Sequence, residues 1–202
     1  PRLPVVVSDS SLIRRHAAVS SDQVSGTRAA VQHLLDLGHP TVHHLSGPPD
    51  SSPAEVRQET WRETLRAAGR PVPQVWGGDW TLQAGYELGP TVAADPQITA
   101  VFCANDEMAA GLMRSLHEHG VAIPQDVSVV GFDDIPVAEY LWPPLTTVHQ
   151  DFGQIGAELV RMVLERLRGG DEALAYHVVV PTTFVVRAST APYTARTTAP
   201  RS

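Results

Sequence analysis

The sequence predicts an α/β fold in which parallel strands are covered by helices on both faces. Short apolar, β-branched runs alternate with helical patterns along the 202 residues, as in chains built from strand–helix–strand units. The strand candidates are mainly apolar, which is typical of strands buried on both sides of a sheet. With 43% hydrophobic and 18% charged residues, the chain can form one large domain or two small ones.

The strand candidates are apolar runs that end in glycine, serine or acidic turn residues. In chain order they are residues 5–7, 41–47, 74–80, 98–106, 126–134, 146–148 and two short strands within 177–189 that join at Pro181. We interpret 98–106 and 126–134 as buried strands, and 146–148 as an extended run between the proline pair before it and the helix after it.

Five helix candidates follow from the spacing of apolar residues and from capping residues. They are residues 24–37, 53–69, 81–94, 107–119 and 152–169. Gly38 and Gly120 stand where helices should end, while Asn105 or Asp106, and Asp151, can cap helix starts.

Two of these helices carry sharper expectations. Ser52, Pro53 and Glu55 form a capping box with proline at the first helical position, so Ser52 should be the cap. The side chains expected to face inward from this helix are Val56, Trp61, Leu65 and Ala68. The candidate at 81–94 is weaker because it contains two glycines, and Pro90 should kink or end it.

Charge and composition exclude several classes of protein. A formal net charge of −7 excludes a general nucleic-acid-binding surface, because phosphate contacts need clustered Lys and Arg. No apolar run reaches transmembrane length, and no export signal is visible at the N-terminus, which begins at Pro1. The single cysteine, Cys103, excludes an intrachain disulfide. A cytoplasmic location without membrane contact therefore fits best.

Catalytic, metal and cofactor sites find little support. The sequence has neither a Gly-x-Ser-x-Gly motif nor a phosphate loop. The histidine pairs at 43–44 and 117–119 do not place two ligands on one helical face with a third partner nearby. Cys103 lies in an apolar strand, and we interpret it as an unreactive buried thiol. No metal or cofactor is predicted, and an enzyme is the least favoured class.

Polar residues gather where the predicted strands end. They are Asp9, Ser46, Asp79, Trp80, Asn105, Asp106, Asp133 and Asp134, with Gln150 and Phe152 after the run at 146–148. Ligands of open parallel sheets bind beyond the carboxyl ends of the strands, and carboxylates, amides and an indole ring suit a polyol. Arg57 lies on the same helical face as Trp61, and its planar fork could hold two hydroxyls or a carboxylate.

Each of these residues also has a simpler structural interpretation. Asp79 and Asp106 can be turn or capping residues, which is the usual role of aspartate at such positions. Trp80 can belong to the core, and Arg57 can be a solvated helix residue. No single position decides between the two interpretations, but several polar residues at one end of a sheet together favour a binding site.

Six stretches of the chain together resemble the effector-binding core of lactose-repressor-type (LacI/GalR) transcription regulators. They are GTRAAVQHLLDLGH, LSGPPDSSPAEVRQETW, GGDWT, AVFCANDEMAAGLMRSLHEHGVAIPQDVSVVGFDD, WPPLTTVHQDFGQIG and FVVRAST, in family order and spacing across residues 4–190. The resemblance implies a periplasmic-binding-protein-like fold: two α/β subdomains joined by crossover strands, with an effector, expected to be a sugar, in the cleft between them. It implies no enzymatic activity.

The resemblance also implies domain boundaries. Residues 1–21 and 152–180 would form a partial N-terminal subdomain. Residues 22–151 and 181–192 would form a complete C-terminal subdomain with the hinge, and 193–202 a disordered tail. The family's N-terminal helix-turn-helix headpiece has no counterpart in this sequence, so operator DNA would be bound only through that missing segment. The expected oligomer is a homodimer, because operators with two half-sites suit two-fold proteins.

Carried over residue by residue, the effector site comprises Asp9, Arg57, Trp80, Asn105, Asp133, Gln150 and Phe152. The three residues expected to bond hydroxyls from one wall are Arg57, Asn105 and Asp133. Asp9 would do so from the opposite wall, and Trp80 and Phe152 would supply apolar faces.

Two departures from the lactose-repressor pattern bear on which sugar fits. Pro53 replaces a hydroxyl-bearing residue, and Ser21 replaces an aromatic one. A periplasmic sugar-binding protein shares the fold and is the alternative function. That alternative would need an export signal, whereas a helix-turn-helix preceding the chain would favour the regulator.

Overall fold

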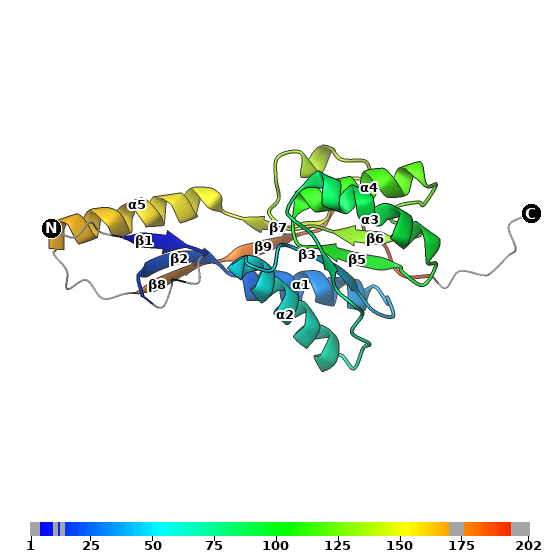
Figure 1. Ribbon diagram of the computed structural model, residues 1–202, viewed down its shortest axis with the longest axis horizontal. Coiled ribbons are helices and arrows are strands. Elements are labelled where there is room, and N and C mark those ends of the chain that lie inside the picture. The colour runs from blue at the N-terminus through cyan, green and yellow to red at the C-terminus, as the bar shows by residue number, and fades with distance from the viewer. Residues whose placement is uncertain (1–4, 10–11, 13–14, 170–175, 195–202) are drawn as a thin grey trace, which may run out of the picture.

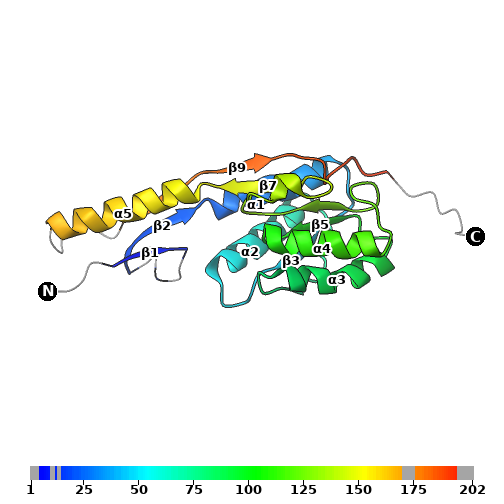
Figure 2. The ribbon, with the colours of Figure 1, turned by 90° about the horizontal axis from the view of Figure 1, so that it is seen from above.

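The computed structural model describes residues 5–9, 12, 15–169 and 176–194, which form an elongated molecule of two lobes (Figure 1, Figure 2). The strands are β1 Val6–Ser8, β2 Ala17–Ser21, β3 His43–Ser46, β4 Trp76–Gly77, β5 Ala100–Cys103, β6 Ser128–Val130, β7 Thr147–Gln150, β8 His177–Val180 and β9 Thr182–Val185. The helices are α1 Gln23–Asp36, α2 Ser52–Ala67, α3 Leu82–Ala94, α4 Asp106–Glu118 and α5 Phe152–Gly169, with a short 3₁₀ helix at Ala138–Tyr140. The predicted α/β class with parallel sheets is confirmed.

The larger lobe is a parallel sheet in the order β4-β3-β5-β6 with helices on both faces. Alternate strand residues point to opposite sides, as the period of a strand requires. Val101 and Cys103 pack with α3 and α4 in one core, whereas Ala100 and Phe102 pack with α1 and α2 in another. Both cores lie within the same lobe, which explains why β5 is apolar at all of its positions.

The smaller lobe is a parallel sheet in the order β1-β2-β8, with α5 packed on one face. Ile155 and Met162 of α5 bury their side chains against Ala17 and Val19 of β2. Further round the same helix, the side chains of Val160, Leu164 and Leu167 are exposed. The helix is therefore apolar on a wider arc than the described sheet covers.

An antiparallel pair of strands, β7 and β9, connects the two lobes. Val148 of β7 stands opposite Phe184 of β9 in the register, and β7 leads directly into α5. The third connection runs from β2 into α1, where Asp22 caps the helix by accepting a hydrogen bond from the amide of Ser25. The three connections lie close together because β9 also packs against the start of α1.

Most helix ends lie where the sequence predicts them. Asn105 Oδ1 accepts from the amide of Met108 at 3.0 Å and caps α4, and Asp151 accepts from the amide of Gln154 at 2.7 Å. Gly38 and Gly120 follow α1 and α4 with φ values of +90° and +71°, which suit glycine.

Two predictions about α2 and one omission need correction. Ser51, not Ser52, caps α2, and the helix begins one residue earlier than expected. Ala68 is exposed rather than buried, because the helix has ended at Ala67 and the chain turns toward solvent. Strand β2 was not predicted, because its alanines and serines lack the β-branched character of the other strands.

The prediction that Pro90 could end its helix is wrong, because α3 continues to Ala94. Close packing against α4 outweighs the poor helix propensity of its glycines. A side chain at Gly85 would lie 1.9 Å from the carbonyl oxygen of Met108, and one at Gly111 would lie 1.9 Å from that of Leu82. The glycines therefore permit a helix–helix approach that the sequence pattern of α3 alone does not reveal.

Among the described residues, no helix combines the length and the apolar character that a bilayer crossing requires. Most of the tail predicted to be disordered, from 195 onward, lies outside the described residues.

Candidate functional site

Arg57, on the second turn of α2, stands at the centre of a buried polar cluster. Its side chain is 4% exposed. Nε donates to Oε1 of Gln23 at 2.8 Å, Nη1 donates to the carbonyl oxygen of Ala104, and Nη2 lies 3.6 Å from Oδ1 of Asp133. The guanidinium carbon lies 3.7 Å from the centroid of the Phe132 ring. The arginine is thus held by hydrogen bonds in its plane and by an aromatic ring on its face, and is not a solvated helix residue.

Two glutamines extend this cluster to carboxylates of both lobes. Nε2 of Gln23 donates to Oε1 of Gln150 at 3.2 Å and to Oδ1 of Asp9 at 3.4 Å. Nε2 of Gln150 in turn donates to Oδ1 of Asp133 at 2.5 Å. Asp9 follows β1, Asp133 follows β6 and Gln150 ends β7, so the cluster lies at the carboxyl ends of strands, where open parallel sheets bind ligands.

Trp80 and Asn105 border the same cluster. Nδ2 of Asn105 donates to the carbonyl oxygen of Trp80 at 2.9 Å and to Oε2 of Glu107 at 2.8 Å. The Trp80 ring lies 5.6 Å from the Arg57 guanidinium and covers Gly47, where an added Cβ would be 2.3 Å from the ring. Asn105 therefore caps α4 and also contacts Trp80, so the structural role and the predicted place in the site apply together to this residue.

Phe152 stands apart from the other predicted residues. The contacts above bring together the other six, whereas Phe152 opens α5 with a side chain that is 57% exposed. That it supplies an apolar face to a ligand stays a prediction.

Backbone strain is concentrated at these residues. Asp9, Trp80, Asp133 and Asp134 adopt φ values of +41°, +72°, +112° and +56°. A residue other than glycine in such a conformation costs about 1–3 kcal/mol, and the strain persists only where the surrounding structure enforces it. Such outliers cluster at ligand-binding sites, so three of the predicted residues carry independent support for a functional role.

Burial shifts the acid–base properties of the cluster. Desolvation lowers the pKa of Arg57 to about 10, although Asp133 and Asp9 oppose the change. Burial raises the pKa of Asp133 to about 6, and the nearby Arg57 and the Gln150 hydrogen bond limit the rise. The pKa of Asp9 is also raised by burial. At neutral pH the cluster therefore pairs the Arg57 cation with the Asp133 carboxylate, with hydrogen-bonding capacity left for a ligand.

A cavity of about 240 Å³ adjoins the cluster between the end of the smaller lobe's sheet and the start of α2. Asp9 and Gln23 line it, together with Pro53 and Val56 of α2. Ser21 also lines it, and its buried hydroxyl has no hydrogen-bond partner among the described residues. Of the seven predicted residues, Asp9 lines this cavity, and Gln23 links the cavity to Arg57 directly and to Asp133 through Gln150.

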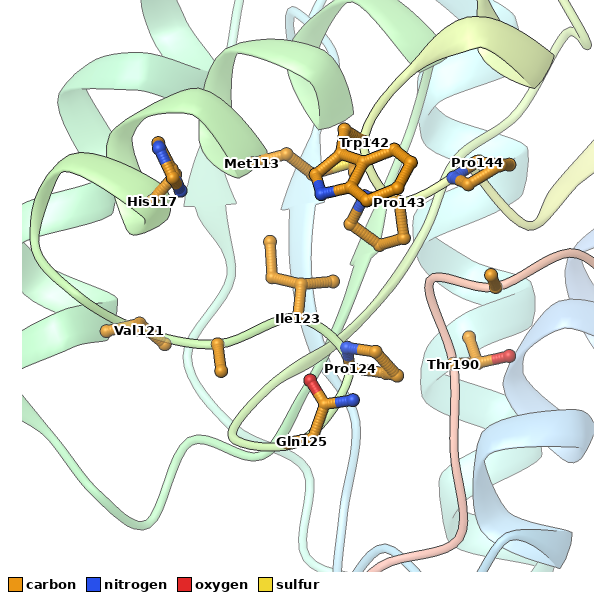
Figure 3. A pocket seen from close by; sticks show the side chains of 12 residues that line it. Met113, His117, Val121, Ile123, Pro124, Gln125, Trp142, Pro143, Pro144 and Thr190 are labelled. Carbon is orange, nitrogen blue, oxygen red and sulfur yellow. The ribbon is translucent and has the colours of Figure 1, made fainter.

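A second cavity, of about 710 Å³, lies away from the predicted residues (Figure 3). Its walls are the end of α4 with Met113 and His117, the segment 121–125, and the Trp142–Pro144 stretch. The lining is mainly apolar, with Gln125, His117 and Thr190 as its polar side chains, and it includes none of the Arg and Asp side chains that distinguish the first site.

Sequence reasoning missed two residues that organise the site. Gln23 bridges Arg57, Gln150 and Asp9, and Phe132 lies under the guanidinium. The signal for Gln23 was its place at the first position of a helix that follows a strand end, but β2 was not predicted. Phe132 precedes the predicted Asp133 in sequence. Its contact with Arg57 depends on the direction of its side chain beyond β6, which the sequence does not reveal.

The arrangement suits recognition rather than chemistry. Carboxylates, amides and a guanidinium donate and accept hydrogen bonds, and Trp80 offers an aromatic face, as a polyhydroxylated ligand requires. Within the part of the chain that the structure describes, no group of three His, Cys, Asp or Glu side chains could hold a metal ion.

Comparison with known proteins places this geometry in a family. The profile of the family described as "Periplasmic binding protein-like domain" matches residues 31–190. The ribose operon repressor of Escherichia coli is 32% identical over 177 residues, which cover 83% of this chain and 52% of the repressor. The chain thus spans about half the length of this curated relative.

Two solved structures agree. A LacI family transcriptional regulator from Enterococcus faecium with bound ribose is 32% identical, covering 95% of this chain and 72% of that one, with a TM-score of 0.86. A lac repressor dimer bound to operator and the anti-inducer ONPF is 31% identical, covering 93% and 65%, with a TM-score of 0.84. The chain therefore belongs to the LacI family of transcriptional regulators and carries the periplasmic-binding-protein-like core of that family.

Proposed function

We propose that this chain is the effector-binding core of a bacterial transcription regulator and that it binds a sugar at the cluster around Arg57. The observation that carries the proposal is the buried pair of Arg57 and Asp133 at the strand ends, which Gln23 and Gln150 also link through hydrogen bonds. Burying a charged pair costs desolvation free energy, and a bound ligand that hydrogen-bonds to the pair beside Trp80 would offset that cost. The related Enterococcus faecium regulator has bound ribose, which supports a small sugar as the class of effector.

The effector would act by differential affinity for two arrangements of the lobes. Asp9 belongs to the smaller lobe, whereas Arg57 and Asp133 belong to the larger one. A ligand that bonds both sets stabilises one relative orientation, and a regulator responds to that difference. We propose domain boundaries at 21/22, 151/152 and 180/181, so the hinge would lie at the three connections between the lobes.

Operator binding would require a segment that this sequence does not contain. The related lac repressor structure is a dimer bound to operator. We propose that the helix-turn-helix of the complete regulator supplies DNA binding, since the core described here is acidic overall. A cytoplasmic location follows for a protein that acts on DNA. The relatives named above are repressors and regulators, which disfavours both an enzyme and a periplasmic transport protein.

A homodimer is the proposed assembly, and the loop before the crossover supplies a surface for it. Trp142 is 93% exposed and lies beside Met113 of α4 (Figure 3). Tyr140, two residues earlier in the chain, is 77% exposed. Contiguous exposed apolar patches mark interaction surfaces, and aromatic side chains are enriched in them. Light scattering should show dimers that Trp142→Asp weakens, whereas a monomeric wild-type chain would count against the assembly.

Isothermal titration against D-ribose and a panel of other monosaccharides tests the proposed function. At least one sugar should bind the wild-type chain. Arg57→Ala should weaken its binding about 100-fold, because two charge-assisted hydrogen bonds are lost. Asp133→Ala should have a similar effect.

Arg66→Ala is the matched control, because Arg66 lies on the same helix but its side chain is exposed. It should bind as the wild type does. Sugar binding that survives both Arg57→Ala and Asp133→Ala would contradict the proposed site.

A further inference from the structure

We propose that Gln23 is a positioning residue of the effector site, which holds the Arg57 guanidinium and fixes the end of the Gln150 amide that faces Asp133. The inference rests on the proposed function, because it concerns the same site. It adds a residue that neither the sequence motifs nor the comparisons point to.

The side chains of four residues form a closed ring of contacts. Arg57 Nε donates to Gln23 at 2.8 Å, and Gln23 donates to Gln150 at 3.2 Å. Gln150 donates to Asp133 at 2.5 Å, and the same Asp133 oxygen lies 3.6 Å from Nη2 of Arg57. The ring starts at the cation, passes through two amides and ends at the carboxylate that pairs with the cation.

The chemistry of the ring leaves one direction for both amides. A guanidinium only donates, so Gln23 must present its oxygen to Arg57. The Gln23 NH₂ then faces Gln150, which must present its own oxygen in return. The Gln150 NH₂ is thereby directed at Asp133, which as a carboxylate only accepts. Each bond in such a chain polarises the next, so the four groups act as a unit.

Gln23 is fixed well enough to impose this direction. It is the first residue of α1, its side chain is 6% exposed, and the cap at Asp22 anchors its backbone. The start of α1 is pressed against the crossover strands, since a side chain at Gly26 would lie 2.7 Å from Val148 and 2.8 Å from Thr182. The second hydrogen of its amide reaches Asp9 at 3.4 Å, so the same residue connects the two lobes.

The orientation of Gln150 decides what an effector meets. As the ring stands, the Gln150 oxygen and the Asp133 carboxylate are both engaged by donors within the protein. Arg57 has five N–H groups, and the ring together with the Ala104 carbonyl uses three of them. The effector would thus meet unused guanidinium hydrogens and free carboxylate lone pairs, which suits adjacent hydroxyls that each donate and accept.

The first test uses the 202-residue chain without any ligand. Gln23→Met keeps the length of the side chain but removes both the acceptor and the donor. We expect exchange of the Gln150 NH₂ protons with D₂O, followed by NMR, to become about five- to tenfold faster, because the amide loses its partner and can rotate. Gln32→Met, at an exposed position of the same helix, should leave that exchange unchanged. A Gln23→Met rate within about twofold of the wild-type rate would overturn the proposal.

A second variant keeps the test decisive if Gln23→Met folds poorly. Gln23→Glu retains the acceptor for Arg57 but turns the Gln150 NH₂ toward the new carboxylate, so Asp133 loses its donor. The charged groups that act on Asp133 are Arg57, Glu107 and Asp9. Carbon-13 NMR of the Asp133 carboxyl group should therefore show a higher pKa in Gln23→Glu than in the wild type.

Repeating this substitution in a Gln150→Met background separates the amide from the added charge. Direct repulsion between carboxylates remains there, but no amide is left to turn. The rise in the Asp133 pKa should be larger when Gln150 is present. Equal rises in the two backgrounds would overturn the proposal.

Titration with D-ribose distinguishes this inference from the proposed function. Gln23→Met should bind about tenfold more weakly than the wild type, and Gln32→Met should bind equally well. Ribose binding that depends on Arg57 but not on Gln23, with unchanged Gln150 exchange, would refute the positioning role alone. Faster Gln150 exchange in a chain whose sugar binding ignores Arg57 and Asp133 would instead refute the function and leave the ring intact.

Discussion

The two lobes are built from the same kind of strand and helix, yet they differ in how completely they are closed. The larger lobe has helices on both faces of its sheet and two apolar cores that meet across it. The described part of the smaller lobe has three strands and one helix, and α5 exposes Val160, Leu164 and Leu167. The larger lobe supplies Arg57, Asn105 and Asp133 from well-packed elements. The difference teaches that, at the proposed site, the closed lobe fixes most of the polar side chains, whereas the open lobe contributes mainly Asp9.

The comparison predicts the largest loss of stability for a substitution that creates a cavity in the core of the larger lobe. Trp61 is fully buried and its Nε1 donates to the carbonyl oxygen of Val42 at 2.9 Å. Trp61→Ala should lower the free energy of unfolding by about 3–5 kcal/mol, measured by urea denaturation. Met162→Ala in the smaller lobe should cost about 2 kcal/mol, because its small core can relax around the gap. Equal losses would show that the two lobes are equally well packed.

Protonation of Asp106, also in the larger lobe, should have the next largest effect on the free energy of unfolding. Asp106 lies under Gly131 and accepts from Thr147 Oγ1 at 2.6 Å and from the amide of Ile135 at 2.9 Å. Burial raises its pKa to about 7, so the folded chain holds a proton that the unfolded chain releases near pH 4. Its contribution is therefore complete below pH 4 and declines as pH rises to about 7, by a few kcal/mol at most.

Asp106→Asn removes this titration while keeping the shape of the side chain. Urea denaturation between pH 4 and pH 7 should show a flatter dependence of stability on pH than in the wild type. If the variant keeps the wild-type slope, another group causes the pH dependence. Asp133, whose pKa is about 6, is then the next candidate.

The smallest expected effects come from two matched glycine substitutions. Gly85→Ala would place a methyl group 1.9 Å from the Met108 carbonyl oxygen at the α3–α4 contact, and should cost about 1–3 kcal/mol. Gly156→Ala on α5 meets nothing within 4 Å and should stabilise the chain by about 0.5–1 kcal/mol through helix propensity. Thermal denaturation of both variants checks the signs. A destabilising Gly156→Ala would mean that the outer side of α5 is packed against a neighbour.

Features that depend on local sequence could be predicted, because capping and periodicity act within a few residues. The helices that end at Gly38 and Gly120, the cap at Asn105 and the buried strand around Phe102 all follow from such rules. The same reasoning brought Arg57, Asn105 and Asp133 to one edge of a sheet, as the structure shows. Gln150 followed from the same reasoning, because it comes just after the extended run at 146–148.

Features that depend on distant contacts could not be predicted. Pro90 remains inside α3 because two glycine-lined helices approach closely, and nothing near Pro90 reveals its partner. Gln23 reaches Arg57, which is 34 positions away in sequence, because β2 leads the chain to the start of α1 beside it. Phe152 lies next to Gln150 and Asp151 in sequence, but the side-chain direction at the start of α5 leaves it exposed. Tertiary packing, rather than residue type, decides all three.

The direct passage of β7 into α5 has a mechanical consequence. Hydrogen bonds of the ring hold Gln150, and α5 begins only two residues later, so the position of the helix is fixed at its N-terminal end. Its 18 residues give it a length of roughly 27 Å at ~1.5 Å per residue. A tilt of about 5° at the N-terminal end would swing the far tip by about 2 Å, a shift of the size seen when helices slide at subunit interfaces. Sub-ångström adjustments around a bound molecule would thus arrive magnified at the remote end of the protein.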